Sequence, residues 1–118
     1  MPQPEPLVLT RLRVRRGAEI ALGPGKVDLL DAIERTGTLA GAAEEMGMSY
    51  MRAWKLVRTM NACFRAPLVE TARGGTARGG ASLTETGRAM RDLYRRMEGA
   101  CQEALKPLTN ELRAHLAE

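Results

Sequence analysis

The chain has 118 residues and a net charge of +4, with 44% hydrophobic and 27% charged residues, one His and two Cys. This composition fits one globular domain rather than a disordered chain, and no apolar run approaches the ~20 residues that span a bilayer. One His and two distant Cys give little basis for a zinc site or for Ser–His or Cys–His catalysis. We therefore expect a cytoplasmic protein that is not an enzyme and that binds no metal or cofactor.

Residues 7–22 carry the pattern of a small β-hairpin. Apolar and basic residues alternate over 7–14 with the period of two that is typical of a strand, residues 16–18 contain a glycine turn, and residues 19–22 supply a second short strand. The preceding residues 1–6 include three prolines and are expected to form a loose N-terminal lead. The strands are short, so the hairpin needs another element to pack against.

Two helices are expected between residues 24 and 46. Pro24 is placed for a helix start, apolar residues follow at helical spacing, and Thr36-Gly37 ends the segment. Thr38 is the candidate N-cap of a second, shorter helix, and Gly47 lies just past its end.

A third helix is expected from Tyr50 to about Phe64, with Ser49 as its N-cap. Ala43 is small enough for the second and third helices to cross closely, and Gly47 permits the positive φ that a sharp turn between them requires. Arg52, Lys55 and Arg58 are spaced three apart and point away from the apolar positions of this pair of helices. Those inward positions are Ala42, Met46, Met48, Ala53, Leu56, Val57 and Met60.

A strand–loop–strand unit is expected after the third helix. Leu68–Thr71 and Ala81–Leu83 have strand character, and residues 73–80 between them form a loop with four glycines and two arginines. A phosphate-binding loop of the Gly-Lys-Ser/Thr kind is an alternative, but that motif does not follow. An RNA-binding arginine–glycine segment is a further alternative, for which two arginines are few.

A long helix is expected from Thr84 to about Ala117, with Pro107 kinking or ending it. Apolar residues recur along it at steps of three and four, which is typical of a helix packed against another helix. A helix of this length exceeds what a small domain can cover, so we expect a second copy of the chain to cover the far half. The predicted dimer residues are Met90, Leu93, Tyr94, Met97, Cys101, Ala104, Leu105, Leu108 and Leu112.

The positive charge is concentrated where these elements meet. Residues 49–83 sum to +5, whereas residues 1–48 sum to −1 and residues 84–118 sum to zero. A helix with one buried stripe and a basic outer face suits the DNA major groove, and arginines on a flexible loop suit the backbone or the minor groove. The predicted DNA-binding residues are Thr38, Ser49, Tyr50, Met51, Arg52, Lys55, Arg58, Arg73, Thr76 and Arg78.

Several residues have a plainer interpretation. Trp54 is interpreted mainly as a packing residue rather than as a base contact. Tyr50 is interpreted slightly more as a contact to a DNA base than as a side chain that only fills the start of the helix. The methionines are interpreted as core rather than as a soft-metal site with Cys63 and Cys101. His115 is expected to be solvated. The hairpin arginines Arg11, Arg13 and Arg15 are interpreted mainly as charges that protect an edge strand, with contact to flanking DNA as the alternative.

The sequence also resembles a known family. The segments that carry the resemblance are Ser49-Tyr50-Met51-Arg52-Ala53-Trp54, Met60-Asn61, Leu68-Val69-Glu70, Thr71-Ala72-Arg73-Gly74-Gly75, and Leu83-Thr84 ahead of Gly87. They are similar to the N-terminal domain of the molybdate-responsive ModE regulators, and the helix-turn-helix is similar to that of LysR-type regulators. The resemblance covers roughly residues 7–105.

The resemblance implies a mainly α fold with small β elements. Residues 7–83 would form a winged helix-turn-helix and residues 84–118 a dimerisation helix. It implies a homodimeric transcription regulator on the bacterial nucleoid, with double-stranded DNA containing a palindromic operator as partner and molybdenum-related genes as suggested targets. Full-length members carry C-terminal molybdate-binding domains of the Mop type, whereas this sequence ends at Glu118, so we expect no such pocket here and leave the effector unknown. The alternative function is a basic helical module that docks an acidic protein.

Overall fold

In the computed structural model, which describes residues 12–72 and 80–117, the chain begins with an antiparallel hairpin. Strand β1 (Val14–Arg16) pairs with β2 (Glu19–Leu22), and Gly17 takes the left-handed conformation with φ 61° that a tight turn requires. The predicted hairpin is confirmed, although Arg16 belongs to the strand rather than to the turn. The expected strand start at residues 7–11 lies outside the described residues.

Three helices follow, as α1 (Pro24–Thr36), α2 (Leu39–Glu45) and α3 (Tyr50–Cys63). The predicted caps are confirmed, because the Thr38 hydroxyl accepts from the Gly41 N–H at 2.9 Å and the Ser49 hydroxyl accepts from the Arg52 N–H at 3.1 Å. Gly37 and Gly47 have φ of 75° and 68°, so both turns use a conformation that glycine adopts without strain.

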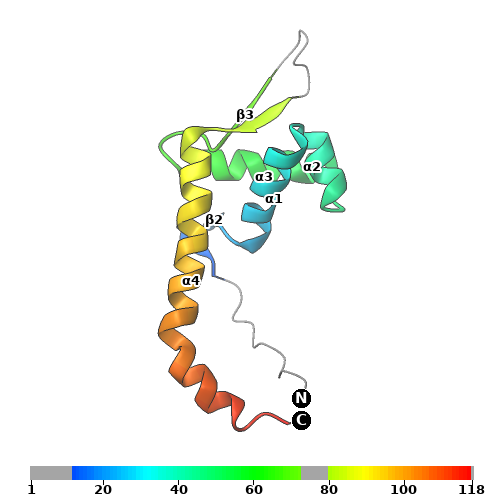
Figure 1. Cartoon of the computed structure of the whole chain (residues 1–118). Coiled ribbons are helices and arrows are strands. Elements are labelled where there is room, and N and C mark those ends of the chain that lie inside the picture. The colour runs from blue at the N-terminus through cyan, green and yellow to red at the C-terminus, as the bar shows by residue number, and fades with distance from the viewer. Residues whose placement is uncertain (1–11, 73–79, 118) are drawn as a thin grey trace.

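Strands β3 (Val69–Thr71) and β4 (Ala81–Leu83) form a second antiparallel pair, with Val69 opposite Leu83. We call this pair the wing strands. Their base is joined to the α1–α2 turn, since the Ala81 N–H donates to the Gly37 carbonyl at 2.9 Å and Thr38 forms an isolated bridge with Gly80. Figure 1 shows the wing strands projecting from one end of the helical part.

Asn61 on α3 connects the third helix to β3. Its side-chain oxygen accepts from the Leu68 and Val69 N–H groups at 2.8 and 3.2 Å, and its amide donates to the Val69 carbonyl at 3.1 Å. The strand therefore starts at a fixed position beside α3.

Replacing Asn61 with Ala is expected to lower the free energy of unfolding by ~1–3 kcal/mol, because half-buried backbone groups lose their partners. Urea unfolding followed by circular dichroism measures this. The matched control is Asn110→Ala at an exposed position of α4, which should change the free energy by less than ~0.5 kcal/mol. Equal effects of the two substitutions would contradict the connecting role of Asn61.

Helix α4 (Glu85–Arg113) is capped by Thr84 and, at 29 residues, is about 43 Å long. It ends four residues before the expected Ala117, and Pro107 lies inside it without ending it. Figure 1 shows that its upper part lies along the domain while its lower part curves beyond the domain. None of the helices in the described part of the chain is long and apolar enough to cross a membrane.

The first turns of α4 contribute to the core of the chain itself. Tyr94 is fully buried, and its phenol donates to the Leu12 carbonyl at 2.7 Å. Burial raises the pKa of Tyr94 above its ordinary value, which keeps the phenol protonated and able to donate. Met90 packs against the same core. The prediction that Tyr94 lies in a dimer interface is therefore corrected, since a residue enclosed by its own chain has no surface for a partner.

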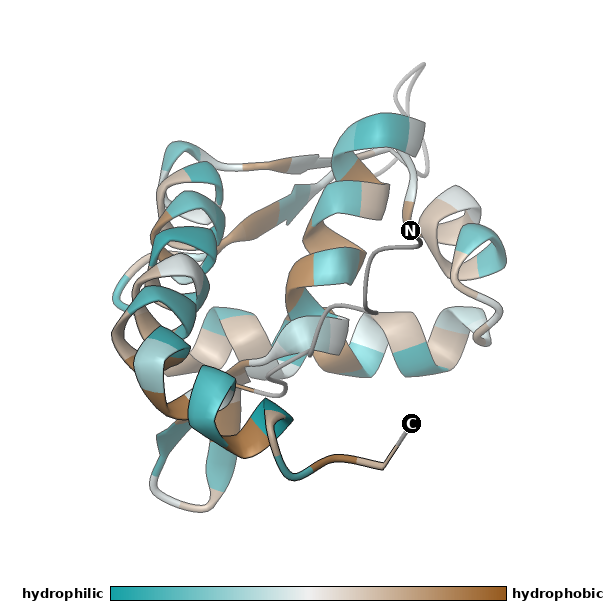
Figure 2. Cartoon of the chain, turned by 60° about the horizontal axis from the view of Figure 1, so that its bottom comes forward, coloured by the Kyte–Doolittle hydropathy of each residue, from teal (hydrophilic) through white to brown (hydrophobic). Residues whose placement is uncertain are grey.

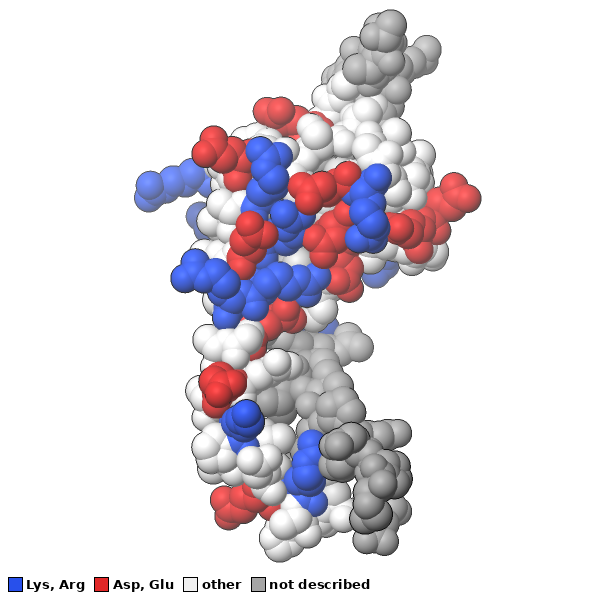
Figure 3. All heavy atoms as spheres, viewed as in Figure 1, with Lys and Arg blue, Asp and Glu red and all other residues white. Residues whose placement is uncertain are grey.

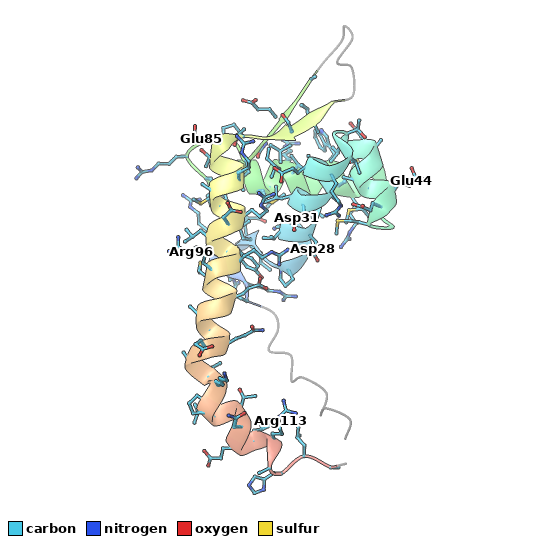
Figure 4. The ribbon with its side chains drawn as sticks, in the orientation of Figure 1. Asp28, Asp31, Glu44, Glu85, Arg96 and Arg113 are labelled. Atoms are coloured by element: carbon cyan, nitrogen blue, oxygen red, sulfur yellow. The ribbon has the colours of Figure 1, made fainter. Side chains whose placement is uncertain are left out.

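Ion pairs connect the first half of α4 to α1. The Arg91 guanidinium lies 2.6 Å from Glu34 and 3.4 Å from Asp31, and Arg95 lies 2.9 Å from Asp31 and 3.1 Å from Asp28. Figure 4 shows Asp28 and Asp31 on the side of α1 that faces α4. Figure 3 shows acidic and basic side chains interleaved over this face, so neither sign of charge dominates it.

Candidate nucleic-acid interface

The outer face of α3 is open to solvent. Ala53, Val57 and Met60 are buried against α1 and α2, which turns the opposite side of the helix outward. The exposed residues on α3 include Tyr50, Met51, Arg52, Lys55 and Arg58. Residues 49–64 contain no Asp or Glu, so this face carries positive charge with no acidic residue of its own helix to offset it.

The two predicted hydroxyl contacts have structural roles. Ser49 caps α3 and Thr38 caps α2, so each hydroxyl accepts a backbone N–H from the helix that it precedes. Ser49 is nevertheless exposed at the end of the outer face of α3, whereas Thr38 is half-buried beside the base of the wing strands. The structure therefore places Ser49, but not Thr38, at the start of the helix that carries the basic residues.

Trp54 was interpreted from sequence mainly as a packing residue, but it lies on the surface of α3. Its side chain remains 39% exposed, and the Arg58 guanidinium lies over the indole ring at 5.3 Å from the centroid. Such a cation–π contact holds an arginine in place while leaving its donors available. The signal for this was the spacing of four between Trp54 and Arg58, which places the two side chains next to each other on a helix.

The remaining predicted DNA contacts, Arg73, Thr76 and Arg78, lie outside the described residues. The wing strands that lead to them are described, and they leave the domain beside the start of α2. Among the described residues, no group of three or more His, Cys, Asp or Glu side chains is arranged to hold a metal ion.

The second candidate surface is the apolar side of α4. Six large apolar side chains of α4 and the residues after it are exposed: Leu93, Met97, Leu105, Leu108, Leu112 and Leu116. Cys101 and Ala104 are also exposed. Leu116 was not among the predicted dimer residues. The other exposed residues are the predicted dimer residues without Met90 and Tyr94. Figure 2 shows hydrophobic patches recurring along α4 to its end. A row of exposed leucines on a helix that extends beyond its domain is typical of a protein–protein contact.

Comparison with known proteins gives a family and a fold. Residues 25–88 match the model of the bacterial regulatory helix-turn-helix protein, lysR family. The chain is 44% identical to the molybdenum-pterin-binding protein MopA of Rhodobacter capsulatus over 86% of its length and 38% of that protein. It is 34% identical to the DNA-binding transcriptional dual regulator ModE of Escherichia coli over 75% of its length and 34% of that protein. The chain thus spans less than two fifths of the length of these curated relatives.

Among solved structures, the fold is similar to that in the crystal structure of the CbnR_DBD–DNA complex. The TM-score is 0.54 at 21% identity, covering 76% of this chain and 93% of that one. This match confirms the predicted fold class, which is mainly helical with small antiparallel sheets and a long C-terminal helix.

Proposed function

This chain belongs to the lysR family of bacterial regulatory helix-turn-helix proteins, and from that membership we propose that it is a sequence-specific transcription regulator that binds DNA as a homodimer. In this proposal α3 enters the major groove and the loop between the wing strands contacts the backbone or the minor groove. The molybdenum-related names of the curated relatives suggest molybdenum-related genes as the first targets to test. The protein would act on the bacterial nucleoid, without enzymatic activity.

The observation that carries this proposal is the outward side of α3. An α-helix is about as wide as the major groove, and its basic side chains must face away from the core to reach bases and phosphates. Here the apolar residues of α3 face the core while Arg52, Lys55 and Arg58 are exposed on a helix with no acidic residue.

Support for the proposed dimer comes from α4. A two-fold symmetric protein matches an inverted repeat, with half-sites one helical turn or a multiple apart. The exposed leucines of α4 lie on the only described helix that extends beyond the domain, so pairing of two α4 helices would bury them and hold two α3 helices at a fixed spacing.

The test is selection from genomic DNA. The purified protein is incubated with random genomic fragments at near-physiological salt, and the retained fragments are sequenced. Recovery of one inverted-repeat site is expected. Uniform retention that vanishes at higher salt would overturn operator recognition and leave only a basic surface, as a module that docks an acidic protein would have.

Lys55 provides a sharper prediction at the recovered site. Lys55→Ala is expected to cost ~1–3 kcal/mol of binding to the preferred duplex and to relax the preference for one base pair. Affinities for the preferred duplex and for a scrambled one are compared, with Lys106→Ala on α4 as the matched control. An equal loss on both duplexes would assign Lys55 to a phosphate instead of a base.

A further inference from the structure

A basic groove lies between the N-terminal hairpin and the start of α3. Its volume is about 410 Å³. The hairpin and the first turn of α1 contribute Arg13, Ile20 and Gly23 to Lys26, and the other wall consists of Met48, Arg52 and Leu56. Three of these side chains are cationic and none is a carboxylate. The groove therefore favours an anion, and it opens beside the helix proposed to enter DNA.

The hairpin lies beside α3 along most of the length of that helix. A second groove, of about 300 Å³, lies between Arg16 and Glu19 of the hairpin and Arg58, Thr59, Ala62 and Cys63 of α3. Strand β2 is in contact with α3. The hairpin thus forms a continuous ridge on one side of the third helix.

The wing strands lie on the other side of α3. With 3.6 residues per turn, positions 52, 56, 59 and 63 share one side of the helix, which is the side that lines the two grooves. Asn61 is on the opposite side, where it binds the backbone at the start of β3. Lys55 is on the outward face between them. Figure 1 shows β2 of the hairpin and the wing strands on opposite sides of α3.

This arrangement has a consequence for a helix inserted into DNA. The major groove is about as wide as one helix and is bordered by a phosphate backbone on each side. Elements that flank the inserted helix on both sides therefore each face one backbone. The wing strands lie on one side of α3, and the hairpin with the first turn of α1 lies on the other side.

We propose that the β1–β2 hairpin and the first turn of α1 form a second DNA-backbone contact, in which Arg13 and Lys26, together with Arg52, bind phosphate on the edge of the major groove opposite the wing. This rests on the proposed function. Arg13 is exposed and keeps its guanidinium available. The Lys26 ammonium donates one hydrogen bond to the Ile20 carbonyl, which holds it at the groove and leaves two donors for an anion.

The test measures how binding of the inverted-repeat duplex depends on salt. Arg13→Gln and Lys26→Gln are made singly and together, with Arg96→Gln as the control for charge. Arg96 lies on the side of α4 away from α1, as Figure 4 shows. The double variant is expected to lower the slope of log K against log salt by about two, one per phosphate contact, with base preference unchanged. Arg13→Lys should retain the wild-type slope, because it retains the charge.

A second readout locates the contact. Hydroxyl-radical footprinting of the double variant should lose protection at one edge of each half-site and keep it at the other edge. Thermal unfolding of each variant checks that loss of the Lys26 hydrogen bond has not unfolded the domain.

The outcomes separate this inference from the function on which it rests. The double variant could keep the salt slope and the footprint of Arg96→Gln while the wild-type protein still selects its site. In that case the proposed hairpin contact is wrong, and the proposed function as a sequence-specific regulator is retained. If the wild-type protein selects no site, the proposed function and this contact fail together.

Discussion

Glutamate in place of Leu108 is expected to separate the proposed dimer into monomers. Leu108 is 61% exposed in the single chain, so the substitution leaves the core of the domain unchanged. In a pair of α4 helices, two-fold symmetry would place both new carboxylates in an apolar contact, where burying an unpaired charge is costly. Because each half-site is then bound alone, affinity for the full inverted repeat should fall by ~10²–10⁴-fold.

Light scattering measures the dimer, and titration of full and half operators measures the affinity. Gln102→Glu is the matched control, because it adds the same charge on α4 at an exposed position outside the apolar row. The control should remain dimeric. A dimeric Leu108→Glu protein with unchanged operator affinity would show that the two copies meet through another surface.

The largest effect on stability is expected at Gly87, near the start of α4. A Cβ at this position would lie 2.0 Å from the Leu68 carbonyl oxygen, far inside van der Waals contact. The same oxygen accepts from the Thr84 N–H at 2.9 Å, so the two backbones cannot move apart without weakening this hydrogen bond. Gly87→Ala is therefore expected to cost ~3 kcal/mol, the upper part of the usual range for overpacking, or more.

Gly99→Ala is the control for Gly87→Ala. Gly99 also lies in α4, but nothing is within 4 Å of a Cβ built there, so Ala should stabilise the helix by up to ~1 kcal/mol. Urea unfolding of both variants gives the two free energies. Equal stabilities of the variants would mean that α4 and the start of β3 are not held as closely as the structure has them.

Local signals in the sequence determined the elements. Thr38 and Ser49 cap α2 and α3 through hydrogen bonds to a backbone N–H three residues further on. Gly37 and Gly47 adopt the positive φ that the turns before and after α2 require. These interactions lie within a few residues of each other, so they can be recognised without knowing the fold. The outward basic side of α3 also follows from the spacing of its apolar residues, which explains why most of the candidate site was predicted.

Only the tertiary structure decided what each apolar stripe packs against. Periodicity placed Tyr94 and Leu108 in one row of α4, yet Tyr94 is buried in its own domain and Leu108 is exposed. The difference arises because the first half of α4 lies against α1, where Arg91 and Arg95 pair with acidic residues of α1, while the second half extends past it. Likewise, the arginines of the hairpin were predicted mainly to protect an edge strand from pairing with another chain. Arg13 lines a basic groove only because the hairpin lies beside α3. A repeat in the sequence identifies which face of an element is apolar or charged. The neighbour of that face depends on contacts between residues far apart in the chain, which no local pattern contains.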